Sequence, residues 1–110
     1  MDMNQYQRLA SRTMGKGWEH NDYIKHALFG LASEVGEIHG IYQKKYQGHL
    51  IDKQHVEKEI GDVLWFIAEL CTALNVRLSD VAEMNIDKLL KRYPEGFSAE
   101  KSLHRAEGDI

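Results

Sequence analysis

The sequence predicts an all-α protein, a four- to five-helix bundle around a central antiparallel pair of long helices. Apolar residues recur with a 3.6-residue period through most of the 110 residues, and no segment sustains the alternation of a strand. Only one proline, Pro94, interrupts the chain. The length suits a single domain over residues 1–110.

The first predicted helix covers roughly residues 2–13. It is broken by the glycines Gly15 and Gly17, which favour a loop. A second helix begins next, because Asn21 or Asp22 can accept hydrogen bonds from the free N–H groups of a first turn.

The second helix is predicted to run to about Tyr46, with Gly48 beyond its end as a stop. A third helix then starts near Asp52 and reaches Leu74. Asn75 suits the left-handed position that terminates it. Short connections make such consecutive helices antiparallel neighbours.

A fourth helix is predicted from Ser79 and Asp80, which can cap its start. Pro94 and Gly96 close it. The polar tail, residues 98–110, lacks an apolar face of its own, so we expect a partner to order it.

Composition excludes several classes of protein. The chain has 14 Lys and Arg against 17 Asp and Glu, a net charge of −3, which suits neither a nucleic-acid polymer nor an anionic membrane as partner. No apolar run approaches the roughly 20 residues of a membrane span. The single Cys71 cannot form an internal disulfide. We expect a cytoplasmic protein.

Two pairs of acidic residues are the most informative feature: Glu34 with Glu37, and Glu59 with Asp62. A spacing of three places each pair on one helix face. On a helical wheel the two members of each pair lie about 70° and 130° from the core direction of their helix, on the same rotational side. In an antiparallel pair of helices, both acidic pairs therefore face each other or both face away.

The facing arrangement is favoured because the acidic stripe of the second helix is otherwise small or apolar. A solvated surface with nearby lysines is the ordinary alternative for one such pair taken alone. Four carboxylates meeting in one seam would repel each other, and a hard divalent cation relieves that repulsion. Oxygen ligands favour Mg²⁺ or Mn²⁺, and no Cys/His spacing indicates Zn²⁺. The other residues of this stripe are Ala27, Gly30 and Ile41.

A row of polar and basic residues lies on the predicted fourth helix. Asn85, Lys88 and Arg92 align at spacings of three and four, so together they can hold phosphate oxygens. Surface solubility and the helix dipole are the alternative explanation for the two cations.

Three aromatic residues remain open to more than one interpretation. Trp18 can stack on a nucleobase or pack in the core or an interface. Trp65 and Phe66 lie off the core direction of the third helix, and we expect them to bury against a partner subunit. A homodimer would cover them.

The chain resembles the MazG-like all-α nucleoside triphosphate pyrophosphohydrolases over roughly residues 4–100. The resemblance is carried by GLASEVGE at 30–37, KEIGDVLW at 58–65, NIDKL at 85–89 and RYPEGF at 92–97. The paired acidic motif combined with the later helix and its ending is specific, whereas one acidic pair alone is not.

The resemblance implies a Mg²⁺-dependent hydrolase, with Mn²⁺ as a substitute, that converts a (deoxy)nucleoside triphosphate to the monophosphate and pyrophosphate. It implies a role in cleaning the nucleotide pool and assembly as a homodimer or a dimer of dimers. The residues it assigns are Glu34, Glu37, Glu59 and Asp62 to the metal and catalysis, and Asn85, Lys88 and Arg92 to the phosphates.

One departure and two alternatives accompany this resemblance. Many relatives carry a further Glu where this chain has Ser33, which leaves the number of metals and the water-activating group open. A phosphoribosyl-ATP or dUTP-type pyrophosphohydrolase shares the same helical architecture. A catalytically silent module that binds a nucleotide or dimerises is the alternative outside enzymes.

Overall fold

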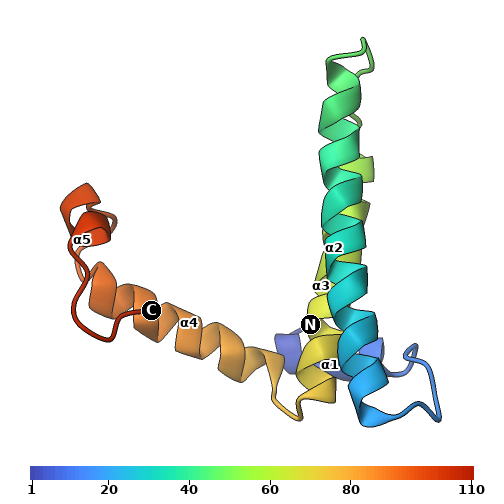
Figure 1. Cartoon of the computed structure of the whole chain (residues 1–110), viewed down its shortest axis with the longest axis horizontal. Coiled ribbons are helices and arrows are strands. Elements are labelled where there is room, and N and C mark those ends of the chain that lie inside the picture. The colour runs from blue at the N-terminus through green and yellow to red at the C-terminus, as the bar shows by residue number, and fades with distance from the viewer.

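A computed structural model describes all residues 1–110 and consists of five α-helices without a strand (Figure 1). The all-α prediction is confirmed. None of the helices is both long and apolar enough to cross a membrane. The helices are α1 (Met3–Ser11), α2 (His20–Lys45), α3 (Lys53–Ala73), α4 (Leu78–Arg92) and α5 (Ala99–Leu103).

The two long helices, α2 and α3, form the predicted antiparallel pair and lie side by side (Figure 1). The chain turns between them through Gly48, whose φ of 93° is a conformation that glycine adopts without strain. Asp52 then caps α3, because its side chain accepts a hydrogen bond from the backbone N–H of Gln54. Every acidic residue of the paired motif therefore belongs to this hairpin.

Helix α2 starts earlier than predicted. Its cap is Glu19, which makes no side-chain capping hydrogen bond, and neither Asn21 nor Asp22 takes that position. Asp22 lies inside the first turn, where its negative charge favours the positive end of the helix dipole. The polar residues Asn21 and Asp22 therefore mark the first turn of α2 and not its cap.

Helix α4 also starts before the predicted Ser79, and a residue of another helix stabilises its first turn. Its own cap, Arg77, makes no side-chain capping bond. Gln7 of α1 instead accepts from the Leu78 N–H at 2.8 Å and donates to the Val76 carbonyl at 2.9 Å. Gln7 therefore ties α1 to the turn between α3 and α4.

The small core lies where α1 crosses α3 and meets the start of α4. Trp65 packs against this core and donates a hydrogen bond to Thr13 at 2.8 Å, and the Phe66 ring lies over Gly30. These aromatic rings are partly buried within their own chain, and further burial against a partner subunit stays a prediction. The buried apolar residues of this core are Ala10, Ala68, Cys71 and Leu78.

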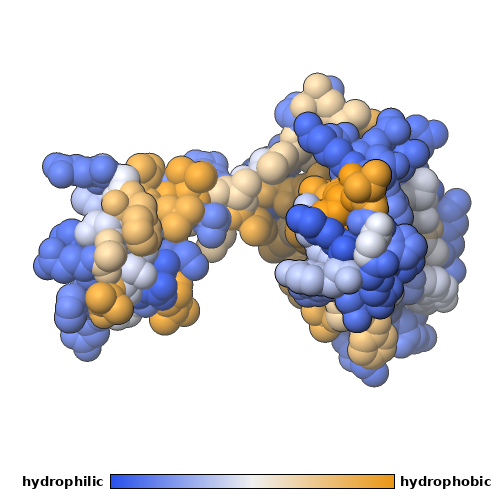
Figure 2. Space-filling model, turned by 90° about the horizontal axis from the view of Figure 1, so that it is seen from above, coloured by the Kyte–Doolittle hydropathy of each residue, from blue (hydrophilic) through white to orange (hydrophobic).

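Helix α4 leaves the hairpin and forms an arm, so that the chain is L-shaped (Figure 1). Its radius of gyration is 17.3 Å, whereas a compact chain of this length has about 13 Å. Apolar side chains gather on this arm (Figure 2), and Ile86 and Leu90 are both more than half exposed. The Tyr93 ring at the end of this helix lies 5.4 Å from that of Phe97, whereas the exposed apolar side chains before it have no covering element.

The C-terminal tail folds back onto the arm. Ser98 caps the short helix α5, and the chain then returns so that Asp109 pairs with Arg92 of α4. The tail was expected to depend on a partner for order, and in the structure its contact is with its own chain.

Removing the Gln7 side chain should weaken the junction of α1, α3 and α4. We expect Gln7→Ala to lower the free energy of unfolding by about 1–3 kcal/mol, because the half-buried Leu78 N–H loses its acceptor. Urea denaturation followed by circular dichroism measures this. Arg8→Ala, at an exposed position of the same helix, should change stability by less than about 0.5 kcal/mol. Equal effects of the two substitutions would contradict the proposed tie.

Candidate metal centre

Three carboxylates of the hairpin converge on one point. Glu34 comes from α2, and Glu59 and Asp62 come from α3. One oxygen of each lies within 4.8 Å of the others, a spacing at which one cation can touch all three. The structure thus brings together three of the four acidic residues singled out from the sequence.

Two of these carboxylates, Glu34 and Glu59, are partly buried, whereas Asp62 is exposed. The Glu59 side chain is only 12% exposed. One oxygen of Glu34 and one of Glu59 are buried and have no hydrogen-bond partner in the chain. Buried polar atoms are nearly always paired, so these two oxygens indicate a ligand of the opposite charge. An all-oxygen donor set suits a hard divalent cation.

The neighbouring carboxylates raise the pKa of Glu34. Its pKa is raised from an ordinary 4.5 to about 7, first because its protonated form can donate a hydrogen bond to Glu59. Burial and the negative charges of Glu37 and Asp62 raise it further. Without a cation, the cluster therefore holds a proton near neutral pH.

Glu37 lies at the exposed edge of the same cluster, outside the group of three. Its pKa is also raised, mainly by hydrogen bonding and charge repulsion with Glu59, while His55 acts in the opposite direction. His55 lies one turn before Glu59, with 3.4 Å between its Nε2 atom and the carboxylate. We did not single out His55 from the sequence, although a spacing of four from an acidic motif residue was a usable signal.

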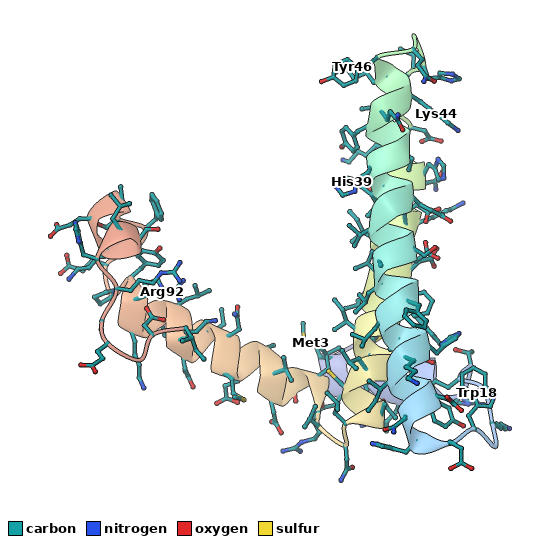
Figure 3. The ribbon with its side chains drawn as sticks, viewed as in Figure 1. Met3, Trp18, His39, Lys44, Tyr46 and Arg92 are labelled. Atoms are coloured by element: carbon teal, nitrogen blue, oxygen red, sulfur yellow. The ribbon has the colours of Figure 1, made fainter.

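The predicted phosphate-binding row does not reach the carboxylates within one chain. Asn85, Lys88 and Arg92 lie on α4, and Figure 3 shows Arg92 at the far end of the arm. Arg92 holds both oxygens of Asp109, at 2.8 and 2.7 Å, and keeps the pKa of that carboxyl below its usual value. Lys88 and Arg92 line a cavity of about 660 Å³ between the arm and the tail.

Trp18 packs at the end of the hairpin where α2 begins. Its ring lies so close to Gly15 that a Cβ there would come within 2.3 Å of it. Its centroid is 5.0 Å from the rings of both Tyr23 and His26. The side chain is nevertheless 41% exposed, so packing within the chain leaves part of the ring free.

The sequence of this chain matches a known protein family. The MazG nucleotide pyrophosphohydrolase domain matches residues 23–97. The chain belongs to the MazG family. It is 34% identical over 82 residues to the gene 37 protein of Mycobacterium phage L5, an overlap that covers 66% of this chain and 68% of that protein. No solved structure matches the chain.

The matched MazG segment contains all four motif carboxylates and the polar row of α4. It leaves out α1, Trp18 and the tail with Asp109. Within the segment, sequence reasoning overlooked His26 and Glu69, whose side chains form a pair inside the hairpin. The available signal was the position of Glu69, seven residues after Asp62 and therefore on the same face of α3.

The raised pKa of Glu34 predicts an unusual pH dependence for the metal-free MazG domain. A carboxyl with a raised pKa in the folded state stabilises the fold fully below pH 4.5, and this contribution is lost as pH rises through about 7. In the presence of chelator, we expect the melting temperature to fall more between pH 5.5 and pH 8 in the wild type than in Glu34→Gln. Scanning fluorimetry measures both slopes, and identical slopes would contradict this assignment.

Proposed function

We propose that this protein hydrolyses a (deoxy)nucleoside triphosphate to the monophosphate and pyrophosphate in a Mg²⁺-dependent reaction. The observation that carries the proposal is the convergence of Glu34, Glu59 and Asp62, with two buried partnerless oxygens, in a chain of the MazG family. A role in removing unwanted nucleotides from the pool follows from the same chemistry.

Glu34, Glu59 and Asp62 would hold the cation. Mg²⁺ suits them because it takes oxygen ligands, keeps several waters and completes its coordination with substrate phosphates, and Mn²⁺ can substitute for it. When bound, the ion supplies charge neutralisation at the phosphates and a water of lowered pKa. Binding it also removes the proton that Glu34 holds near neutral pH.

Glu37 is suited to orient the attacking water. It borders the cluster but remains exposed, so its carboxylate can accept a hydrogen bond from a water beside the substrate. Ser33, at the position where a further Glu occurs in relatives, cannot act as a general base. Glu37 is therefore the carboxylate we assign to this step.

A second copy of the chain can complete the site. The accessible surface is 8601 Å², whereas a compact monomer of this mass exposes about 6,200 Å². The excess matches the area that each subunit of an obligate homodimer buries. The residues that this dimer would cover include the exposed apolar side chains Val81, Met84, Ile86 and Leu90 of α4.

In such a homodimer, or a dimer of dimers, α4 of one subunit would cross the hairpin of the other. Asn85, Lys88 and Arg92 of one chain would then face the carboxylates of its neighbour and bind the phosphates. Arg92 would exchange its carboxylate partner, Asp109, for phosphate oxygens, which offer the same two-point geometry. The exposed part of the Trp18 ring is the surface on which the base can stack.

The activity itself is testable with variants of the cluster. We expect Glu59→Gln and Asp62→Asn to lower kcat by at least about a hundredfold and to abolish Mg²⁺ binding, measured by pyrophosphate release and calorimetry. Glu37→Gln should lower kcat by about 10²–10⁴-fold while the protein still binds the ion. Glu57→Gln, on an exposed face of α3, is the matched control and should behave as wild type.

The substrate panel should contain the common triphosphates, dUTP and phosphoribosyl-ATP. Release of pyrophosphate identifies the class of enzyme, and the preferred substrate separates the related pyrophosphohydrolases. Tight binding of a triphosphate without product, with either Mg²⁺ or Mn²⁺, would refute the proposal in favour of a silent binding module. Unchanged turnover in Glu59→Gln would refute it as well.

Sharing of the site between subunits predicts that two inactive variants rescue each other. Mixing Glu59→Gln with Lys88→Ala should restore about one quarter of wild-type activity, because half of the dimers are mixed and one of their two sites is intact. Each variant alone should stay inactive. Absence of rescue, or a monomer by light scattering at micromolar concentration, would contradict the shared site.

A further inference from the structure

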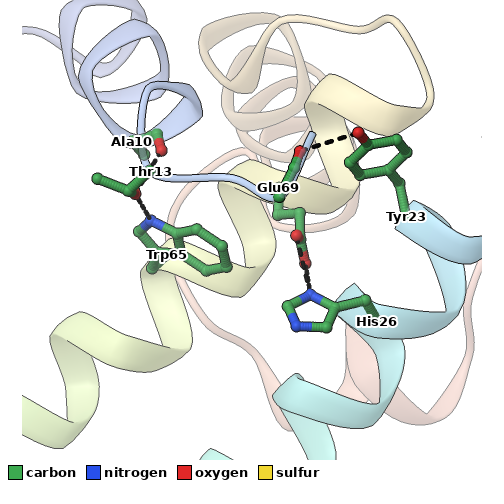
Figure 4. Close-up of polar contacts among 7 residues, drawn as sticks. Ala10, Thr13, Tyr23, His26, Trp65 and Glu69 are labelled. Carbon is green, nitrogen blue, oxygen red and sulfur yellow. Dashed lines mark hydrogen bonds and ion pairs between the residues drawn. The ribbon is translucent and has the colours of Figure 1, made fainter. Parts of the chain in front are cut away.

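Two ion pairs of this chain connect different elements. His26 and Glu69 join α2 to α3 inside the hairpin (Figure 4). Arg92 and Asp109 join the end of α4 to the tail, and their side chains are only 10% and 14% exposed. The guanidinium of Arg92 donates one hydrogen bond to each oxygen of Asp109, at 2.8 and 2.7 Å. Arginine binds a phosphate group with the same two-point geometry.

The cavity beside the Arg92–Asp109 pair is basic. Its lining contains five lysines and arginines but only three aspartates and glutamates, whereas acidic residues are in excess in the chain as a whole. Its volume of about 660 Å³ is that of a small-molecule site. A cavity with an excess of cations favours an anionic ligand. The five cations are Lys88, Lys91, Arg92, Lys101 and Arg105.

Three of these cations act on the Asp109 carboxylate. Arg92 lowers the pKa of that carboxyl, first through its hydrogen bonds, and the charges of Arg105 and Lys88 lower it further, against the opposing effect of burial. Lys88 and Arg92 belong to α4, whereas Arg105 belongs to the tail. A carboxylate of the chain itself therefore lies among cations from both walls of the cavity. A diphosphate group offers more charged oxygens to these donors than a carboxylate does.

The tail that carries Arg105 and Asp109 lies beyond the matched MazG segment, which ends at residue 97. Figure 1 shows the tail returning from α5 to the side of α4. A turn closed by a hydrogen bond from the Asp109 N–H to the Ala106 carbonyl, at 3.1 Å, precedes the contact with Arg92. The tail thus adds one cation to the cavity wall and also places an anion against Arg92.

We propose that the cavity between α4 and the tail binds a diphosphate group through Lys88, Arg92 and Arg105, and that Asp109 competes with this group for Arg92. The inference rests on the proposed function for its role in the reaction, because Lys88 and Arg92 belong to the phosphate-binding row of that site. Asp109 is then an autoinhibitory residue. The ligand binds only the fraction of molecules in which the Arg92–Asp109 pair is open, which weakens its apparent affinity.

Asp109→Asn tests the competition, because it removes the charge of the side chain and keeps its shape. We expect the Kd of inorganic pyrophosphate to fall about tenfold, since Arg92 holds a neutral acceptor less strongly than a carboxylate. Calorimetry in EDTA measures this Kd without a cation at the metal cluster. Glu95→Gln removes the same charge at an exposed position outside the cavity and should bind as the wild type does. Unchanged or weaker binding in Asp109→Asn would overturn the proposal.

Arg105→Ala tests the contribution of the tail to binding. We expect the Kd of pyrophosphate to rise about tenfold, because one charge-assisted contact is lost. Arg105 is exposed, so the variant should fold, which circular dichroism checks. Arg8→Ala, at an exposed position of α1, removes the same charge outside the cavity and should keep the wild-type Kd. Equal Kd values in the two variants would assign binding to overall charge and overturn the proposal.

Inorganic pyrophosphate and dATP separate the two sources of a diphosphate group. In EDTA, a Kd for pyrophosphate at or below that of dATP would assign the cavity to the free anion. A lower Kd for dATP that Arg105→Ala raises would assign it to the phosphates of a nucleotide. Absence of binding by both probes would overturn the proposal.

Turnover adds a measurement that a merely structural tail would not change in the same direction. In the presence of Mg²⁺, Asp109→Asn should lower the KM of the triphosphate more than it changes kcat, whereas loss of a structural anchor would raise KM. If Glu59→Gln is inactive and Asp109→Asn binds pyrophosphate as the wild type does, only the inference about the cavity fails. If Glu59→Gln remains active, the proposed function fails, and the binding measured in EDTA still decides the inference.

Discussion

The repulsion among carboxylates in the α2–α3 hairpin is the constraint on which the rest of this structure depends. Glu34, Glu59 and Asp62 lie close together, His55 is the basic residue in contact with them, and two of their buried oxygens have no hydrogen-bond partner. A fold selected for stability alone would separate these charges or add a lysine. The hairpin instead holds them together, an arrangement that the proposed cation would make favourable. The negative charges that the proposed cation would neutralise are thus already in place in the metal-free protein.

The same hairpin is too small to provide everything that a nucleotide requires. Its two helices supply acidic groups and aromatic rings, while the basic residues of the polar row stand on α4, on the arm. A single chain therefore keeps the carboxylates that we propose for the cation apart from the basic residues that we propose for the phosphates. Asp109 neutralises Arg92 within the chain, which keeps an unassembled arm from presenting a bare guanidinium. In the proposed dimer, assembly would bring these two sets of residues together.

Periodicity and spacing were enough to predict the helical class, the central antiparallel pair and the carboxylates that converge. These are properties of local geometry, since residues three apart share a helix face wherever the helix goes. The start of α4 could not be predicted, because its first turn is satisfied by Gln7, 71 residues away in the sequence. Nor could the path of α4, because nothing local distinguishes an apolar face that packs inside the chain from one that awaits a second copy.

The aromatic residues show the same limit of prediction from local sequence patterns. Trp65 and Phe66 lie away from the average core direction of α3, and a wheel drawn for one helix assigns such residues to an outside partner. In the structure they contact Thr13, which follows α1, and Gly30, because a short helix and a glycine bring other backbone close to that side. Glu69 was passed over for a related reason, since a charged residue on a buried stripe is recognisable only when its partner is known.

Gly30 has a consequence for the width of the hairpin. A Cβ at this position would lie 2.1 Å from the Phe66 ring, so the ring rests directly on the backbone of α2. Glu34 follows one turn later on the same helix, and Asp62 precedes Phe66 by one turn on the other. Because Gly30 has no side chain, α2 and α3 approach closely here, and this close approach sets the distance between the opposing carboxylates. In the proposed metal site, Gly30 would thereby limit the size of the ion that fits between α2 and α3 without touching it.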